Sequence, residues 1–297
     1  MCISPIRIRN PAKFPKTPFV DVPCGKCVEC LKKRYNDLNF RLQNEFSMAK
    51  KPCYFFTLTY APEFLPWYCV DENSGYIVPY PRKEDVSGFV RSLRDKIRYE
   101  LKKQGFKNSQ IKEYTNFKYY ICSELGDKNL RPHFHGLIYN FPFTLDYFRL
   151  FLREYWTKGF ITADYLNSRR IGYTIKYLLK DQFILDDYYP DLDQSLFKVR
   201  LSSKGIGDFS KEQYRFLRQN KTFMFENENG KKVTIPKYYR DKLFIYFPQM
   251  KLEWSKYVAE FHDQTPESTI DNNHRYRVYE KSSKKFYKHR KEKKDLL

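Results

Sequence analysis

Two histidines flank a single residue in the segment Arg131–Gly136, which reads RPHFHG. Side chains two residues apart on a β-strand point to the same face, so the imidazoles of His133 and His135 would converge there. Neutral imidazoles bind divalent transition metals, and a carboxylate would complete a site that stays open to substrate. We expect Glu124 to be that third ligand, because it ends the preceding strand of a predicted hairpin. The alternative interpretation is two polar residues on a solvated strand face.

Two tyrosines one helical turn apart form a second candidate group. Tyr173 and Tyr177 are four residues apart and share one face of a predicted helix, with Lys176 and Lys180 in a neighbouring row. A tyrosine hydroxyl can attack a phosphodiester if a metal polarises the phosphate and a cation stabilises the developing charge. The alternative is an aromatic stripe that packs on a sheet.

A run of three cysteines near the N-terminus indicates a soft-metal site. The C-x2-C-x2-C run consists of Cys24, Cys27 and Cys30. A tetrahedral zinc ion needs a fourth ligand, for which the candidates are Cys2, Cys53 and Cys69. A ferredoxin run would have its next cysteine where Arg34 stands, so an iron–sulfur cluster is disfavoured. Ordinary reduced thiols remain the alternative, since an odd total of seven cysteines argues for a reducing cytoplasm.

The elements that must position these groups follow from periodicity and breakers. The pattern predicts helices over 31–50, 83–104, 144–156 and 168–180, and strands over 54–60, 117–124, 133–139 and 160–165. Five prolines exclude a helix from residues 1–30, which we expect to be irregular. Residues 61–82 read as a long loop that could contain a small hairpin. This order predicts an α+β fold of ferredoxin-like type, with an antiparallel sheet and flanking helices.

The composition narrows the choice of partner. The chain has 297 residues, with 55 Lys and Arg against 35 Asp and Glu, a formal net charge of +20, and 19% aromatic residues. Such an aromatic content argues against a disordered chain, and a charge of this size predicts a polyanionic partner, with nucleic acid as the leading candidate. No apolar run is long enough for a membrane-spanning helix, and we expect neither a secretory signal nor a membrane partner.

Several ordered segments then resemble the motifs of one family, the replication initiation proteins of the HUH endonuclease superfamily. The resemblance is strongest to those of microviruses of the gokushovirus kind, which are small single-stranded DNA bacteriophages, and it covers roughly residues 20–210. The segments that carry it are Pro23–Cys30, Phe56–Tyr60, Ser123–Gly126, Arg131–His135, Tyr173–Lys180 and Lys204–Gly207. One departure is Leu125, which stands where tyrosine is usual.

The resemblance implies rolling-circle replication. Mg²⁺ or Mn²⁺ would be held by His133, His135 and Glu124, and Tyr173 or Tyr177 would attack the viral origin in single-stranded DNA, leaving a 3′-hydroxyl and a 5′-phosphotyrosine bond. The lysine Lys176 would assist the charge stabilisation. Thr57 and Thr59 would touch DNA or metal-bound water, or serve only sheet packing, and the further DNA contacts would be Arg131 and Lys180.

The same resemblance implies partners and a domain plan. The chain contains no P-loop motif, so a host helicase would unwind the duplex and a host polymerase would extend the 3′-hydroxyl, in the cytoplasm of a bacterial host. The plan is an N-terminal cysteine segment and helix over 1–50, an HUH endonuclease core over 51–200, a C-terminal extension over 201–261, and a linker with a basic tail over 262–297. The alternatives are another HUH nuclease (a plasmid initiator, relaxase or transposase) and a non-enzymatic, zinc-stabilised single-stranded nucleic-acid-binding protein.

Overall fold

The computed structural model describes residues 2–10, 18–73, 75–126, 130–176, 193–226, 230 and 232–264. The chain divides into two compact units. One unit is Tyr35–Asp208, and the other combines Met1–Arg34 with Phe209–Leu297. Within the described ranges, every helix is too short or too polar to cross a bilayer.

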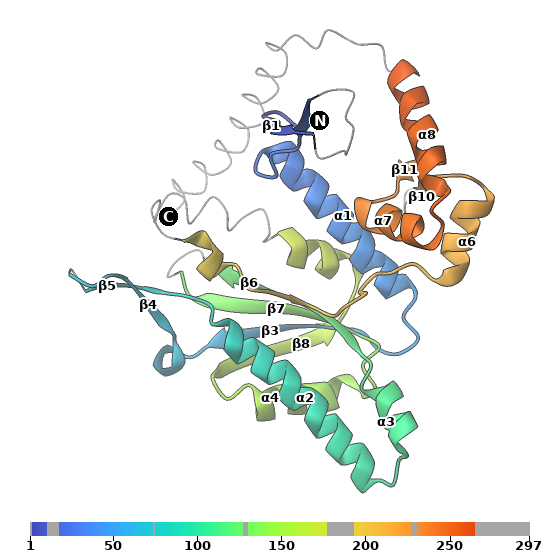
Figure 1. The fold of residues 1–297 in the computed structure, drawn as a ribbon. Coiled ribbons are helices and arrows are strands. Elements are labelled where there is room, and N and C mark those ends of the chain that lie inside the picture. Colours follow the sequence, from blue (N-terminus) through green and yellow to red (C-terminus); the bar gives the residue numbers. More distant parts are fainter. Residues whose placement is uncertain are drawn as a thin grey trace. The chain divides into compact units, whose positions relative to one another are not determined.

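The larger unit is built on a five-stranded sheet with the order β8-β3-β7-β6-β9, in which every neighbouring pair is antiparallel (Figure 1). Its strands are β8 (Gly159–Tyr165), β3 (Tyr54–Tyr60), β7 (Pro132–Tyr139), β6 (Lys118–Leu125) and β9 (Arg200–Ser202). In the central strand β3, buried and half-buried residues alternate, as a sheet covered on both faces at unequal depth requires. The predicted α+β class with an antiparallel sheet and flanking helices is confirmed.

One face of the sheet is covered by α2 (Lys83–Lys103), α3 (Asn108–Tyr114) and α4 (Leu145–Tyr155) (Figure 1). The apolar stripe of α2 packs there against strand residues that include Phe56, Leu58 and Phe134, each no more than 1% exposed. Burial of such a stripe, rather than helix propensity, is the main source of helix stability in a domain. This core therefore fixes the side of the sheet to which the alternate residues of β3 and β7 point.

The opposite face is covered by the part of α1 (Val28–Ser47) from Tyr35 onward and by helical residues 168–176. Their buried residues Leu42, Ile171 and Ile175 meet Cys122 and Leu137 of the sheet. The predicted helix over 168–180 is thus helical as far as residue 176, and its remainder lies outside the described residues.

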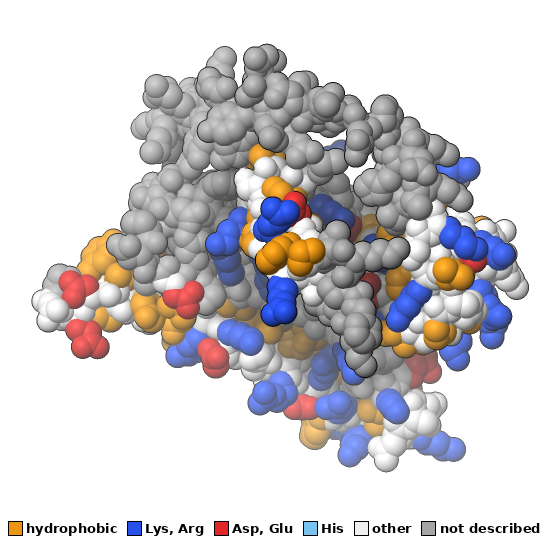
Figure 2. All heavy atoms as spheres, turned by 45° about the horizontal axis from the view of Figure 1, so that its top comes forward, with side chains coloured by type: hydrophobic (Ala, Val, Ile, Leu, Met, Phe, Trp, Pro, Cys, Tyr) orange, Lys and Arg blue, Asp and Glu red, His pale blue; other side chains and the backbone are white. Residues whose placement is uncertain are grey.

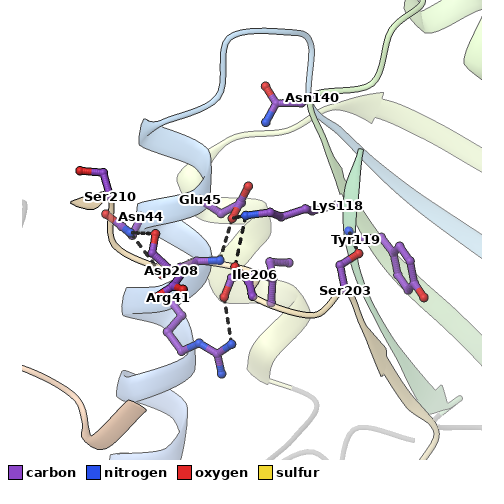
Figure 3. A network of polar contacts seen from close by, with 12 residues as sticks. Arg41, Asn44, Glu45, Lys118, Tyr119, Asn140, Ser203, Ile206, Asp208 and Ser210 are labelled. Carbon is purple, nitrogen blue, oxygen red and sulfur yellow. Dashed lines mark hydrogen bonds and ion pairs between the residues drawn. The ribbon is translucent and has the colours of Figure 1, made fainter. Parts of the chain in front are cut away.

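A short segment after β9 is tied to α1 and β6 by a network of polar contacts (Figure 3). Glu45, only 4% exposed, accepts hydrogen bonds from Lys118 Nζ at 2.8 Å and from the Gly207 amide at 2.7 Å. The Arg41 guanidinium donates to the Ile206 carbonyl at 2.9 Å. The backbone of Gly207 has φ +68°, and a Cβ there would lie 2.1 Å from the Arg41 carbonyl oxygen, so glycine is required at this approach.

Two hairpins depart from what the sequence pattern predicts. Residues 1–30 are not wholly irregular, because β1 (Ile6–Arg9) pairs with β2 (Phe19–Val22). Prolines exclude a helix but tolerate short edge strands, which explains the difference. The predicted loop 61–82 contains β4 (Trp67–Asp71) and β5 (Tyr76–Pro79), which form the projecting arm in Figure 1.

The second unit also contains elements that the weak pattern after residue 181 does not predict. They are α6 (Lys211–Gln219), β10 (Met224–Glu226), β11 (Lys232–Thr234), α7 (Lys237–Tyr246) and α8 (Met250–Gln264). Aromatic contacts hold them together, among them the stacked rings of Phe209 and Tyr239 with centroids 3.8 Å apart. Over the described surface seen in Figure 2, Lys and Arg side chains predominate over acidic ones.

Candidate active site

The strand register brings three of the predicted site residues to one face of the sheet. His133 pairs across β6 with Glu124 and across β3 with Thr59, while His135 pairs with Cys122 and Thr57. Directly paired residues of antiparallel strands share a face. Phe134, between the histidines, points the other way and is completely buried in the core beneath α2 and α4. A large apolar residue between two histidines therefore determines which face they occupy.

Glu124 and His135 form a short contact inside the sheet unit. Glu124 Oε2 lies 2.6 Å from His135 Nε2, and the two residues are 8% and 6% exposed. Charge-assisted bonds of this length are among the stronger ones, and they matter most where water is excluded. The His135 ring also stacks on Phe55, with centroids 5.8 Å apart and planes 16° apart. The imidazole is thus held on its edge by the carboxylate and on its face by the phenyl ring.

His133 is half-buried, and burial lowers its pKa. The neighbouring charge of Glu124 acts in the opposite direction, whereas His135 and Arg131 lower the pKa further. Because desolvation is the larger effect, the neutral imidazole is favoured. The neutral form is the one that can offer a nitrogen lone pair to a cation.

The three side chains fit a divalent cation in their chemistry. Two imidazoles and one carboxylate are the donors that such ions accept in open sites. With the side chains as they stand, the ligand atoms of His133, His135 and Glu124 do not all lie within 4.8 Å of one another, a limit that the cysteine cluster meets. The Glu124–His135 hydrogen bond would have to be exchanged for bonds to the ion.

Tyr173 lies beside this group. Its ring meets the His135 ring edge to face at 5.7 Å between centroids, and 48% of the residue is exposed. Ile171 and Ile175 are fully buried against the sheet, which sets the rotation of the helix and leaves Tyr173 at the surface. A tyrosine that is both exposed and in contact with a candidate metal ligand is well placed to meet an incoming phosphate.

The other predicted residues are placed less completely. Lys176 lies in the same helical segment and is exposed, and Arg131 is half-buried at the start of β7. Tyr177 and Lys180 lie outside the described residues.

Two residues that the sequence did not single out complete the surroundings of Tyr173. Phe55 contacts both His135 and Tyr173, and the Arg170 guanidinium lies 5.7 Å from the centre of the Phe55 ring. Arg170 also donates to Asp164 at 2.7 Å. Both could have been found from spacing, because Phe55 is two residues before Thr57 on the strand and Arg170 is three before Tyr173 on the helix.

The cysteine cluster is a separate feature, in the second unit. The sulfur atoms of Cys2, Cys24, Cys27 and Cys30 all lie within 4.8 Å of one another. Cys2 Sγ is 3.6 Å from Cys24 Sγ and 3.8 Å from Cys27 Sγ. Tetrahedral zinc with bonds of about 2.3 Å separates its sulfurs by roughly 3.8 Å, so the spacing is compatible with a structural zinc.

Backbone amides support the thiolate form within this cluster. The amides of Lys26 and Cys27 donate to Cys24 Sγ at 3.4 and 3.3 Å, and these bonds lower the pKa of Cys24. Burial alone would raise the pKa of Cys27, but backbone hydrogen bonds from Ile3 and Cys30 and contacts with neighbouring thiols lower it to about 6. Thiolate is the form that binds zinc.

The structure also selects the fourth cysteine from the three candidates. Cys2 joins the run, whereas Cys53 is buried in the core of the sheet unit and Cys69 is exposed on β4. Pairing of β1 with β2 returns the chain to its first residues, which a linear reading of the spacing could not foresee.

Comparison with known proteins gives one family match. A model of the replication-associated protein family that takes its description from ORF2 matches residues 53–182. This segment begins just before β3 and includes the histidine pair, Glu124 and both tyrosines. The match therefore coincides with the part of the chain that builds the candidate site.

Three curated relatives carry related names. The chain is 25% identical to replication-associated protein ORF2 of Spiroplasma virus 4, over 91% of this chain and 88% of that protein. It is also 25% identical to replication-associated protein VP4 of Bdellovibrio phage phiMH2K, over 80% and 71% of the two chains. A third, replication-associated protein ORF4 of Chlamydia phage 1, is 25% identical over 75% of this chain and 53% of its own length. No solved structure matches the chain.

Proposed function

We propose that this chain is a phage replication initiation protein that cleaves and rejoins single-stranded DNA through a tyrosine-linked intermediate. The observation that supports this best is the contact of exposed Tyr173 with the buried His135–Glu124 pair, inside the segment that matches the replication-associated family. The names of the three relatives favour phage replication over the plasmid, conjugative and transposase alternatives.

In the proposed reaction the Tyr173 oxygen forms a bond to the scissile phosphorus as the bond from phosphorus to the 3′-oxygen breaks. The phenol loses its proton and the leaving oxygen gains one, which gives a free 3′-hydroxyl and a 5′-phosphotyrosine. A divalent cation, Mg²⁺ or Mn²⁺, held by His133, His135 and Glu124, would neutralise charge on the phosphate. Attack of a 3′-hydroxyl on the phosphotyrosine reverses the step, so joining needs no nucleotide cofactor.

Other side chains would assist. Lys176, three residues after Tyr173 and exposed, would neutralise the developing negative charge on the phosphate oxygens. Tyr177 would serve as the second nucleophile in two successive transfers. Arg131 and Lys180 would contact the DNA backbone, and a host helicase and polymerase in the bacterial cytoplasm would supply unwinding and extension.

A covalent adduct tests the proposal directly. Incubation of the full chain with labelled single-stranded origin DNA and Mn²⁺ should give a protein–DNA adduct that survives denaturing electrophoresis. The double variant Tyr173→Phe, Tyr177→Phe should form none, because phenylalanine has no nucleophilic oxygen, and Tyr99→Phe, an exposed tyrosine on α2, is the matched control. The variant His133→Ala, His135→Ala should bind DNA without cutting it.

The cysteine cluster supports a second candidate, a non-enzymatic zinc-stabilised protein that binds single-stranded nucleic acid. The same experiment separates the two functions. Binding of DNA without an adduct on any single-stranded sequence would contradict the nuclease and favour the binding protein.

A further inference from the structure

Two threonine hydroxyls of β3 lie against the two candidate metal-binding histidines. Thr57 Oγ1 is 3.2 Å from His135 Nδ1, and Thr59 Oγ1 is 3.1 Å from His133 Nδ1. The register explains the symmetry, because each threonine is directly paired with its histidine across the β3–β7 ladder. The threonines therefore form one row parallel to the histidine row.

These contacts turn both rings the same way. The Nδ1 atoms face β3, so each Nε2 atom is directed toward β6 and the turn that follows it. His135 Nε2 meets Glu124 of β6, and a Cβ placed on Gly126 would lie 3.1 Å from His133 Nε2. No hydrogen-bond partner for His133 Nε2 lies among the described residues. Both Nε2 atoms thus point to the side on which the candidate carboxylate stands.

A hydroxyl suits a histidine that must change partners. While Nε2–H donates to Glu124, the neutral His135 ring has a bare Nδ1, and Thr57 can donate its O–H to it. When Nε2 binds a cation, the proton must reside on Nδ1, and the same hydroxyl can turn and accept it. A carbonyl or carboxylate could satisfy only the second state, so threonine supports both without moving the ring.

We infer that Thr57 and Thr59 are positioning residues, which hold the two imidazoles with Nε2 directed at the cation of the proposed function. Partners of this kind on the second ring nitrogen orient metal-binding histidines and raise their basicity. The inference rests on the metal site of that proposed function. It assigns the hydroxyls to the histidines instead of to DNA.

Packing alone does not require the hydroxyls. Both threonines are half-buried on β3, and valine would fill nearly the same space with a comparable strand preference. A valine substitution consequently removes the hydrogen bond while it preserves the shape, and a serine substitution removes the methyl group while it preserves the hydrogen bond. The pair of substitutions separates orientation from packing.

Titration of Mn²⁺, followed by its electron paramagnetic resonance signal, measures the effect without turnover. The variants Thr57→Val and Thr59→Val should each bind Mn²⁺ about 10–100-fold more weakly than the unmodified chain. Thr57→Ser and Thr59→Ser should stay within a few-fold of it. Thr162→Val, at the exposed position that pairs with Thr57 from β8, should bind normally. The variant His133→Ala, His135→Ala gives the background from other sites.

The outcomes distinguish this inference from the function on which it rests. Normal Mn²⁺ binding by both valine variants would overturn the positioning role and leave the nuclease proposal standing. Weakened DNA binding in the presence of a chelator, with Mn²⁺ affinity unchanged, would also overturn it and make the threonines DNA contacts. An unmodified chain that binds Mn²⁺ no better than the double histidine variant would overturn the inference and the metal site together.

Discussion

At the scale of single residues, Gly136 shows how closely the site depends on the core beneath it. Gly136 follows His135 on β7 and pairs with Phe56 of β3, whose ring lies directly over it. The sequence suggests only that this glycine allows a close approach, and the structure places a buried phenyl ring there. The absence of a side chain on the core face therefore lets β3 and β7 pack at the point where the histidines stand.

The substitution Gly136→Ala tests this dependence. A Cβ at this position would lie 2.0 Å from Phe56 Cζ, and Phe56 is only 1% exposed, so its ring has little room to move. We expect the free energy of unfolding to fall by about 1–3 kcal/mol, as for other overpacked cores. Denaturant titration monitored by circular dichroism gives the value.

A second glycine serves as the control. Gly88 lies within α2, and a Cβ there would meet no atom within 4 Å. Gly88→Ala should stabilise the chain by about 0.5–1 kcal/mol through helix propensity. Equal stability of Gly136→Ala and the unmodified chain would show that Phe56 can move aside.

At the scale of elements, the segment after β9 is held by one buried carboxylate. Glu45 of α1 joins Lys118 of β6 and the amide of Gly207, so a helix, a strand and a loop meet at one side chain (Figure 3). Lys118 also donates to the Gly205 carbonyl at 3.2 Å. Loss of the carboxylate would leave an ammonium and a backbone amide without this acceptor.

We expect Glu45→Ala to lower the free energy of unfolding by roughly 2–3 kcal/mol. Breaking a fully buried pair costs about 3–5 kcal/mol, and the Lys118 side chain is 30% exposed, which reduces the cost. The matched control is Glu113→Ala, whose pair with Lys51 is at the surface, with Glu113 74% exposed. It should change stability by no more than about 0.5 kcal/mol. Similar losses in both variants would contradict the role assigned to Glu45.

Much of the element order could be predicted, because its signals are local. The stripe of α2 and the alternation of β3 are visible in the sequence, and the order of helices and strands gives the class. The β1–β2 pair and the elements after Phe209 could not be predicted, since short strands and weakly amphipathic helices depend on partners distant in sequence.

The site divides in the same way. The face shared by His133, His135 and Glu124 follows from strand periodicity and a hairpin, both of which are local. The contacts of Phe55, Arg170 and the two threonines depend on the side-by-side position of β3 and β7, which are more than 70 residues apart. Motif resemblance named the threonines, but only the register relates each one to its histidine.

At the scale of the whole molecule, the cysteine cluster predicts a local requirement for metal. If zinc is bound by Cys2, Cys24, Cys27 and Cys30, its removal should loosen the unit to which they belong and leave the sheet unit folded. Elemental analysis should give about one zinc per chain. After a chelator is added, hydrogen exchange should rise in residues 18–30 and stay low in β3, β6 and β7.

The variant Cys2→Ser should behave like the chelated protein, and Cys69→Ser is the matched control because Cys69 is exposed on β4, away from the cluster. Zinc well below one per chain, together with unchanged exchange after chelation, would contradict a structural metal at this site.

The division of the chain has a consequence for the order in which the protein takes shape on the ribosome. Residues Tyr35–Asp208 are one continuous stretch, whereas the other unit needs Met1–Arg34 and the residues from Phe209 onward. The first 34 residues are synthesised first but must wait for the last third of the chain, while the sheet can close once β9 and the Gly207 segment have emerged. A nascent chain halted shortly after residue 208 would thus hold a finished sheet beside an N-terminal segment that still lacks its partners.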